Sequence, residues 1–411
     1  MKQPITNIMK TFFKTVPVII GMVTITSIAF AQDSTQVDPP NKARGGATKM
    51  LLAGKAEFSW TKTMTQMQGT PDVSSHSFFP DAFMLMPLVK VSDKLFFDGQ
   101  VEVDANPIGG GAAINLVEMI AYYRVAPSLS IFAGNFSPKY GLYLGVLDDF
   151  TNRYCTDPIG MARGPQTQTG FGIQGGIQAG YSKFNYQFYI ANGPQLVVDS
   201  TTHGNGNATG MLNYDNYLDN NNNKSIGGSI GFLPFSNSSL QLDVSGQMTG
   251  KTGNAGDPLE NVSSTSFAAD LNYYHVFNPV MLRVQAEYNS TTTQNKDYTW
   301  KDTSNTLIVP SFKNQLSGWF LGATVRASGS DNVFLSNLEL GGRIGAYAPP
   351  TYSAASTPAI YPWGENPESQ TTVCLTYWFT WKTPLNLAYD VLKTTNGPTI
   401  TSYTARFIYF F

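Results

Sequence analysis

Charged side chains are scarce in this sequence. Asp, Glu, Lys and Arg make up 13% of its 411 residues, whereas they make up roughly 25% of an average soluble protein. Histidine occurs three times and cysteine twice, so few groups are available as catalytic bases or nucleophiles. The formal net charge of −2 gives no basic surface for nucleic acid. These shortages argue against a His-based enzyme and predict no nucleic-acid partner.

Long apolar runs are confined to the first 31 residues. Three lysines precede an apolar run over residues 16–30, and Ala29-Phe30-Ala31 has the small–x–small form of a cleavage site. A membrane-anchoring helix is the alternative, but the run is short for spanning and contains Thr and Gly. We therefore predict a signal peptide at 1–31. Its removal leaves 23 basic and 28 acidic residues, a net charge of −5.

The remainder of the chain alternates between apolar and polar residues. Residues 32–48 are polar and contain Pro-Pro and Gly-Gly pairs, so we expect a disordered periplasmic leader there. From residue 49 onward no run approaches the ~18 apolar residues that a membrane helix needs. Instead Leu242, Val244 and Met248 alternate with polar neighbours, and a period of two indicates strands. We assign residues 49–411 to one β-domain.

Sixteen segments have this alternation. We predict strands at 49–60, 81–91, 95–105, 114–125, 129–136, 170–180, 184–192, 225–235, 239–248, 266–276, 280–290, 314–327, 333–347, 369–382, 385–393 and 399–411. A soluble β-sandwich would also alternate, so this pattern alone leaves two fold classes open.

The lengths of the connections favour one of them. Short connections of two to five residues alternate with longer ones. The outer connections include 61–80, 137–169, 193–224, 249–265, 291–313 and 348–368, with two shorter ones around 106–113 and 394–398. Short periplasmic turns and long outer loops are typical of a transmembrane antiparallel β-barrel. An even strand count also places both ends of the barrel on the periplasmic side. The predicted fold is therefore all-β, a barrel of about sixteen strands.

The last strand carries an aromatic face. Over residues 399–411, Tyr403, Phe407, Tyr409 and Phe411 fall on one side, and Arg406 falls on the other. The stretch resembles the C-terminal strand of bacterial outer-membrane barrels, including porins. That resemblance implies that the barrel assembly machinery reads Tyr409 and Phe411 as an assembly signal. It also implies outer-membrane lipid around the barrel and, because porins of this size are commonly trimers, a homotrimer.

A barrel of sixteen strands is too wide for its own side chains to fill, so it encloses water. The strand registers turn a set of charged residues inward, and we take these as candidates for the lumen wall. They are Asp98, Glu102, Glu118, Arg124, Arg283, Glu287, Glu339 and Arg343. Solvation of the wall alone would also account for them.

The loop at 137–169 is the candidate for a constriction. The segment before it, F-A-G-N-F-S-P-K-Y-G-L, resembles the G-x-F-x-P-x-x-G motif of the phosphate-selective porin O/P group at Gly134, Phe136, Pro138 and Gly141. In general porins the third outer loop enters the lumen, and this is the third by count. The alternative is an ordinary loop on the rim. The candidate constriction residues are Lys139, Asp148, Asp149, Arg153, Asp157 and Arg163.

The charges of this loop differ from those expected for the O/P group. The candidates include three basic and three acidic side chains, and the predicted wall leans acidic. Anion selectivity in the O/P group depends on many basic lumen residues, so we do not carry it over. Opposed charges would favour small polar solutes with a weak preference for cations. Cys155 lies in the same loop and Cys374 faces inward, so a disulfide or two free thiols are both open.

The sequence also has features that bear on three other functions. An enzyme would need a base beside a nucleophile, but His76, His203 and His275 form no group with Ser or Asp in the sequence. Asp215, Asp219 and the nearby asparagines could bind calcium, although a polar outer loop explains them equally. The Asn- and Thr-rich loops at 193–224 and 291–313 would suit an adhesin or receptor. We expect no enzyme, no cofactor and no metal.

The sequence as a whole predicts an outer-membrane porin. It would form a water-filled channel for the passive diffusion of small hydrophilic solutes or ions. The alternative that remains is an outer-membrane barrel that anchors adhesive or receptor loops.

Overall fold

The computed structural model describes most of the predicted barrel. The described residues are 49–67, 69–105, 112–142, 152–159, 164–197, 210–214, 217–298, 300–301, 307–308, 312–351 and 366–411. The expected signal peptide at 1–31 and the expected leader at 32–48 lie outside these ranges. Within them, no helix is long and apolar enough to span a membrane.

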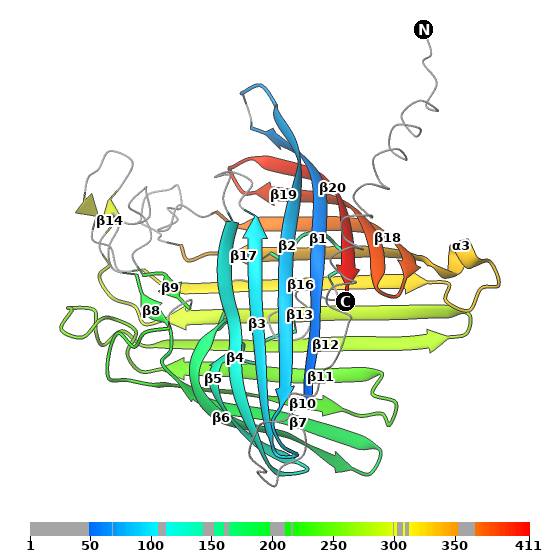
Figure 1. Ribbon diagram of the computed structural model, residues 1–411. Coiled ribbons are helices and arrows are strands. Elements are labelled where there is room, and N and C mark those ends of the chain that lie inside the picture. Colours follow the sequence, from blue (N-terminus) through cyan, green and yellow to red (C-terminus); the bar gives the residue numbers. More distant parts are fainter. Residues whose placement is uncertain are drawn as a thin grey trace.

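Sixteen strands form one closed antiparallel barrel in the order of the chain. This confirms the predicted fold class and strand number. Figure 1 shows β1 to β4 running across the strands behind them, as expected when the strands tilt strongly against the barrel axis. The barrel strands are β1 (Lys49–Gln66), β2 (Val73–Lys90), β3 (Leu95–Ala105), β4 (Ala112–Ala126), β5 (Leu129–Phe136), β6 (Gln168–Ala179), β7 (Ser182–Ala191), β10 (Ser225–Leu233), β11 (Leu240–Thr249), β12 (Ser264–Phe277), β13 (Val280–Thr293), β16 (Gln315–Arg326), β17 (Leu338–Ala348), β18 (Glu368–Thr380), β19 (Thr383–Thr394) and β20 (Thr399–Phe410).

The two faces of each strand differ in polarity and in exposure. On β11, Val244 and Met248 on the outer face are exposed, whereas Ser245 and Gln247 on the inner face are buried. The same division holds on β18, where Val373 is exposed and its inward neighbours are buried. Exposed apolar side chains on the outer face of a barrel suit contact with lipid. The barrel therefore has the faces of a transmembrane protein.

The first hairpin is longer than the sequence predicted. Residues 61–80 were expected to be a loop, but β1 continues to Gln66 and β2 begins at Val73. Pairs such as Lys62 with His76 extend the ladder, and Gln66 also pairs with Thr399 of β20. These outer ends are largely polar because they lie beyond the apolar band. The apolar alternation used to find strands is therefore absent there.

The predicted start of another strand was also wrong. The strand predicted at 333–347 begins instead with one helical turn, α3 (Val333–Ser336), and β17 follows. Asn332 causes this, because its side-chain oxygen accepts hydrogen bonds from the backbone N–H groups of Phe334 and Leu335. Two small hairpins in the outer loops were not predicted either. They pair β8 (Gln195–Leu196) with β9 (Leu212–Asn213), and β14 (Trp300–Lys301) with β15 (Leu307–Ile308).

Candidate functional site: a loop inside the barrel

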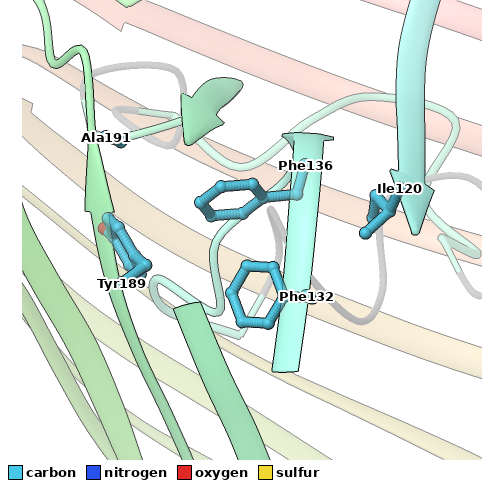
Figure 2. Close-up of a cluster of buried hydrophobic side chains, with 5 residues drawn as sticks. All are labelled: Ile120, Phe132, Phe136, Tyr189 and Ala191. Carbon is cyan, nitrogen blue, oxygen red and sulfur yellow. The ribbon is translucent and has the colours of Figure 1, made fainter. Parts of the chain in front are cut away.

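The loop after β5 leaves the wall from an aromatic cluster on the inner face. Phe132 and Phe136 of β5 pack edge to face with ring centroids 4.8 Å apart, and Tyr189 of β7 lies 5.3 Å from Phe136. Ile120 and Ala191 complete the cluster, whose members are almost fully buried (Figure 2). Gly134 has a φ of +139° and lies too close to Met119 for a side chain. This cluster fixes the direction in which the loop enters the barrel.

The first part of the loop is held along the inner wall by its own backbone. Successive N–H groups donate to inward side chains of β4, β7, β11 and β13. These hydrogen bonds run from Ser137 to Glu118 at 3.0 Å, from Lys139 to Gln187 at 2.9 Å, from Gly141 to Ser245 at 3.0 Å and from Leu142 to Glu287 at 2.8 Å. The hydroxyl of Tyr140 also donates to the backbone carbonyl of Phe267.

The far part of the loop lies on the opposite wall. Arg343 of β17 donates to the backbone carbonyls of Thr156 and Asp157 at 2.9 and 3.0 Å. Arg406 of β20 donates to the carbonyl of Asn152 at 2.6 Å. Backbone carbonyls of β16 and β17 and side chains of β18 and β19 accept the other hydrogen bonds. Tyr154 donates to Ala323 and Gly342, Thr156 to Asp390, and the Ile159 amide to Gln370.

The described parts of this loop therefore span the lumen. The loop leaves β5, the fifth strand of the barrel, and its far part contacts β17 to β20, the thirteenth to sixteenth. Its outgoing and returning parts also meet, because Gly164 lies where a side chain would collide with the ring of Tyr140. A position on the outer rim would not allow these contacts.

Three of the six constriction candidates can be placed. Lys139 is exposed, and so is Asp157, whose carboxylate accepts from Asn152 at 3.4 Å. Arg153 lies 3.8 Å from the carboxylate of Glu339, and its guanidinium is 4.5 Å from the ring centroid of Trp378. Asp148, Asp149 and Arg163 lie outside the described residues.

All eight wall candidates have the inward register. Asp98, Glu102 and Glu118 are half-buried on β3 and β4, and Arg124 lies near the periplasmic turn over the ring of Phe96. On the other side, Arg283 is half-buried, whereas the loop segment lies against the buried side chains of Glu287, Glu339 and Arg343. Glu118, Glu287, Glu339 and Arg343 therefore contact the described parts of the loop, whereas Asp98 and Glu102 lie half-buried on β3.

Trp378 was missed by the sequence interpretation. Its indole N–H donates to Glu339 at 3.0 Å, and both Arg153 and Arg326 lie over its ring. A signal was present, because residue 378 falls on the inward, polar face of its strand. A large aromatic on that face indicates a partner within the lumen. The sequence interpretation also missed the aromatic cluster at Phe132 and Tyr189, whose large side chains likewise lie on the inward face.

The remaining candidates are placed as follows. Both cysteines are free thiols. Asp219 binds Lys224, while Asp215 and His203 lie outside the described residues. His76 is exposed near the outer end of β2, and His275 stacks beside Tyr273 near a periplasmic turn. Among the residues with a described position, no group of three or more His, Cys, Asp or Glu could hold a metal ion.

Comparisons with known proteins give fold relatives only. No family model and no curated protein matches the chain. Among solved structures, the outer-membrane channel DcaP of Acinetobacter baumannii aligns with a TM-score of 0.52 and 11% identity, covering 89% of this chain and 97% of its own. OmpF of Salmonella typhi, in complex with daunomycin, gives 0.51 and 13%, covering 89% and 98%. The anion-selective porin of Comamonas acidovorans gives 0.50 and 11%, covering 89% and 100%.

These matches do not confirm the resemblance to the phosphate-selective O/P group. The solved structures and this chain share the barrel fold. The chain is a closed sixteen-stranded antiparallel barrel that resembles the outer-membrane porins of Gram-negative bacteria.

Proposed function

We propose that this protein is an outer-membrane porin that lets small hydrophilic solutes or ions diffuse through a water-filled channel. The observation that carries the proposal is the loop between β5 and β6, which crosses a lumen lined by polar and charged side chains. A loop in this position narrows the barrel without requiring a plug. A narrow passage with charged walls selects solutes by size and by charge.

The passage follows the wall that the described parts of the loop leave less covered. On β12, β13 and β18, most inward residues are buried. Examples are Asn289 and Thr291 of β13 and Thr372 of β18. On β3 the inward residues remain half-buried. This less covered wall carries Asp98, Gln100, Glu102 and Asp104, with Glu118 beside it on β4.

An acidic row beside the passage favours cations. Carboxylates in a narrow channel with low-dielectric walls raise the local concentration of positive ions and repel anions. Lys139 of the loop is exposed and reduces this effect. A weak preference for cations is therefore expected.

Planar-bilayer recording tests both parts of the proposal. The purified full-length protein is expected to give steady single-channel conductance, and the reversal potential in a KCl gradient should indicate preferential passage of K⁺. The double variant Asp98→Asn, Glu102→Gln should move the reversal potential toward zero. Glu260→Gln, which removes a carboxylate from an outer loop, is the matched control and should not. A closed barrel without current contradicts the channel, and a strong anion preference contradicts the assigned passage.

An anchoring function is the second candidate, favoured by the outer loops. Leu196, Val262, Tyr298 and Phe312 form a buried cluster that joins three of these loops. A rigid outer surface of this kind could bind a partner. The absence of current, together with binding of the protein to a host or cell surface, would favour this function.

Two assembly properties complete the proposal. The aromatic residues Tyr409 and Phe411 would direct the chain to the barrel assembly machinery, and the protein would be a homotrimer. Mass measurement of the detergent-solubilised protein by light scattering tests the second point.

A further inference from the structure

The two cysteines of the chain meet inside the barrel. Cys155 belongs to the far part of the loop, and Cys374 is an inward residue of β18. Tyr154, Cys374 and Ala388 form a buried cluster, and Cys155 packs against it. The chain contains two cysteines in 411 residues, and the fold brings both to one place although 219 positions separate them.

The loop backbone is fixed on both sides of Cys155. Arg406 holds the carbonyl of Asn152, and Arg343 holds the carbonyl of Thr156. Cys155 itself has a φ of +59°, a conformation that residues other than glycine rarely adopt. It persists because the neighbouring contacts impose it. The Cys155 side chain is therefore presented to the wall by an ordered backbone.

Cys374 has little room except toward the loop. A Cβ added at Gly341 would lie 2.7 Å from the Sγ of Cys374. Cys374 is 2% exposed. Ala388 lies beside it on β19. The wall around Cys374 is thus closed by neighbouring strands, and its partner group comes from the loop.

We propose that Cys155 and Cys374 form an oxidisable pair that locks the loop to the wall. In the reduced state the loop is held by noncovalent contacts alone. In the oxidised state one Sγ–Sγ bond forms, and the two thiols lose two protons and two electrons. The oxidant is a protein or small-molecule disulfide, whose S–S bond is cleaved to two thiols as it takes up those protons and electrons. Location of the barrel in an oxidising compartment follows from the proposed function.

Oxidation would restrict motion of the loop. Local opening of the segment 152–159 requires that its noncovalent contacts with the wall break, including the hydrogen bonds to Arg343 and Arg406. A covalent link removes the states in which the loop has left the wall. The barrel itself gains little, because its strands are already closed by β1 and β20.

Thiol counting on the full chain tests the pair. The folded protein in detergent is treated with oxidised glutathione, and a second sample is refolded in a glutathione redox buffer. Both are then denatured without reductant, labelled with maleimide and digested. We expect loss of both labels, a mass loss of two hydrogen atoms and a linked peptide that contains Cys155 and Cys374, all reversed by a reductant. Two labelled thiols per chain in both samples would overturn the proposal.

Hydrogen exchange separates a lock from an incidental bond. In the oxidised protein, exchange at residues 152–159 should slow by about tenfold or more. Cys374→Ser should abolish both the linked peptide and the slowing, while still folding into the barrel. An unchanged exchange rate in a fully linked protein would contradict the locking function. None of these measurements depends on ion conduction. Their outcome therefore tests the cysteine pair independently of the proposed channel function.

Discussion

Gly54 and Phe411 exchange two backbone hydrogen bonds. Gly54 donates to the carbonyl of Phe411 at 3.2 Å, and Phe411 donates to the carbonyl of Gly54 at 3.1 Å. This pair extends the ladder in which β1 and β20 close the barrel. The aromatic end of the chain is therefore a paired edge rather than a free one, which removes its tendency to aggregate.

The close approach at Gly54 excludes a side chain. A Cβ there would lie 2.3 Å from the carbonyl oxygen of Met84 and 2.6 Å from the ring of Phe411. We expect Gly54→Val to reduce the yield of closed barrel severalfold, as measured by the shift in gel mobility between unheated and boiled samples. Gly342→Val is the control, because its Cβ would meet only one atom, at 3.9 Å. Equal yields from the two variants would contradict this role of Gly54.

Arg343 is expected to hold the far part of the loop. Its Nη2 group donates to the carbonyls of both Thr156 and Asp157, and each hydrogen bond from a charged group contributes about 1.5–3 kcal/mol. Arg343→Ala should therefore increase hydrogen exchange at 152–159 by at least about tenfold. Lys183→Ala, which removes a basic contact to Ser238 at a periplasmic turn, should leave this segment unchanged. If both variants exchange like the unaltered protein, the loop has other anchors of equal strength.

Asp270 is a source of instability within the wall. It lies in register between Asp243 and Glu287, and neither of its buried carboxylate oxygens has a hydrogen-bond partner. An amide of the same shape would supply donors to these neighbours. We expect Asp270→Asn to stabilise the barrel by about 1–3 kcal/mol, measured as a higher temperature for loss of the compact gel band. Asp243→Asn is the matched comparison, since Asp243 already accepts from Gln241, and it should give no such gain. A lower transition temperature for Asp270→Asn would refute this expectation.

The cluster in the outer loops should respond separately from the barrel. Tyr298 is fully buried against Phe312, with ring centroids 5.1 Å apart. Removal of a buried aromatic side chain costs about 3–5 kcal/mol, so Tyr298→Ala should expose residues 250–263 to protease while the barrel band remains heat-modifiable. Tyr181→Ala, at an exposed turn, should change neither property. Simultaneous loss of the barrel would show that these loops are required for its assembly.

The local pattern of the sequence determined the strands and their faces. Alternation along one strand depends only on neighbouring residues, because successive side chains point to opposite sides. The same pattern placed Asp98, Glu102 and Arg343 on the inner face and counted sixteen strands correctly. It failed at 61–80 and at 333–336, where the apolar alternation stops or where Asn332 starts a helical turn.

The tertiary structure decided which parts of the chain meet. The motif at 134–141 and the position of the loop as the third outer one identified the loop after β5 as a candidate, but only strand pairing around a closed ring places β17 to β20 across from its origin. The contacts of Arg343 with Thr156, of Arg153 with Trp378 and of Cys155 with the wall cluster follow from that placement. These contacts join residues about 190 to 230 positions apart, and no local periodicity records them. The sequence therefore determined the barrel and its polarity, whereas closure of the ring determined which wall residues the described parts of the loop contact.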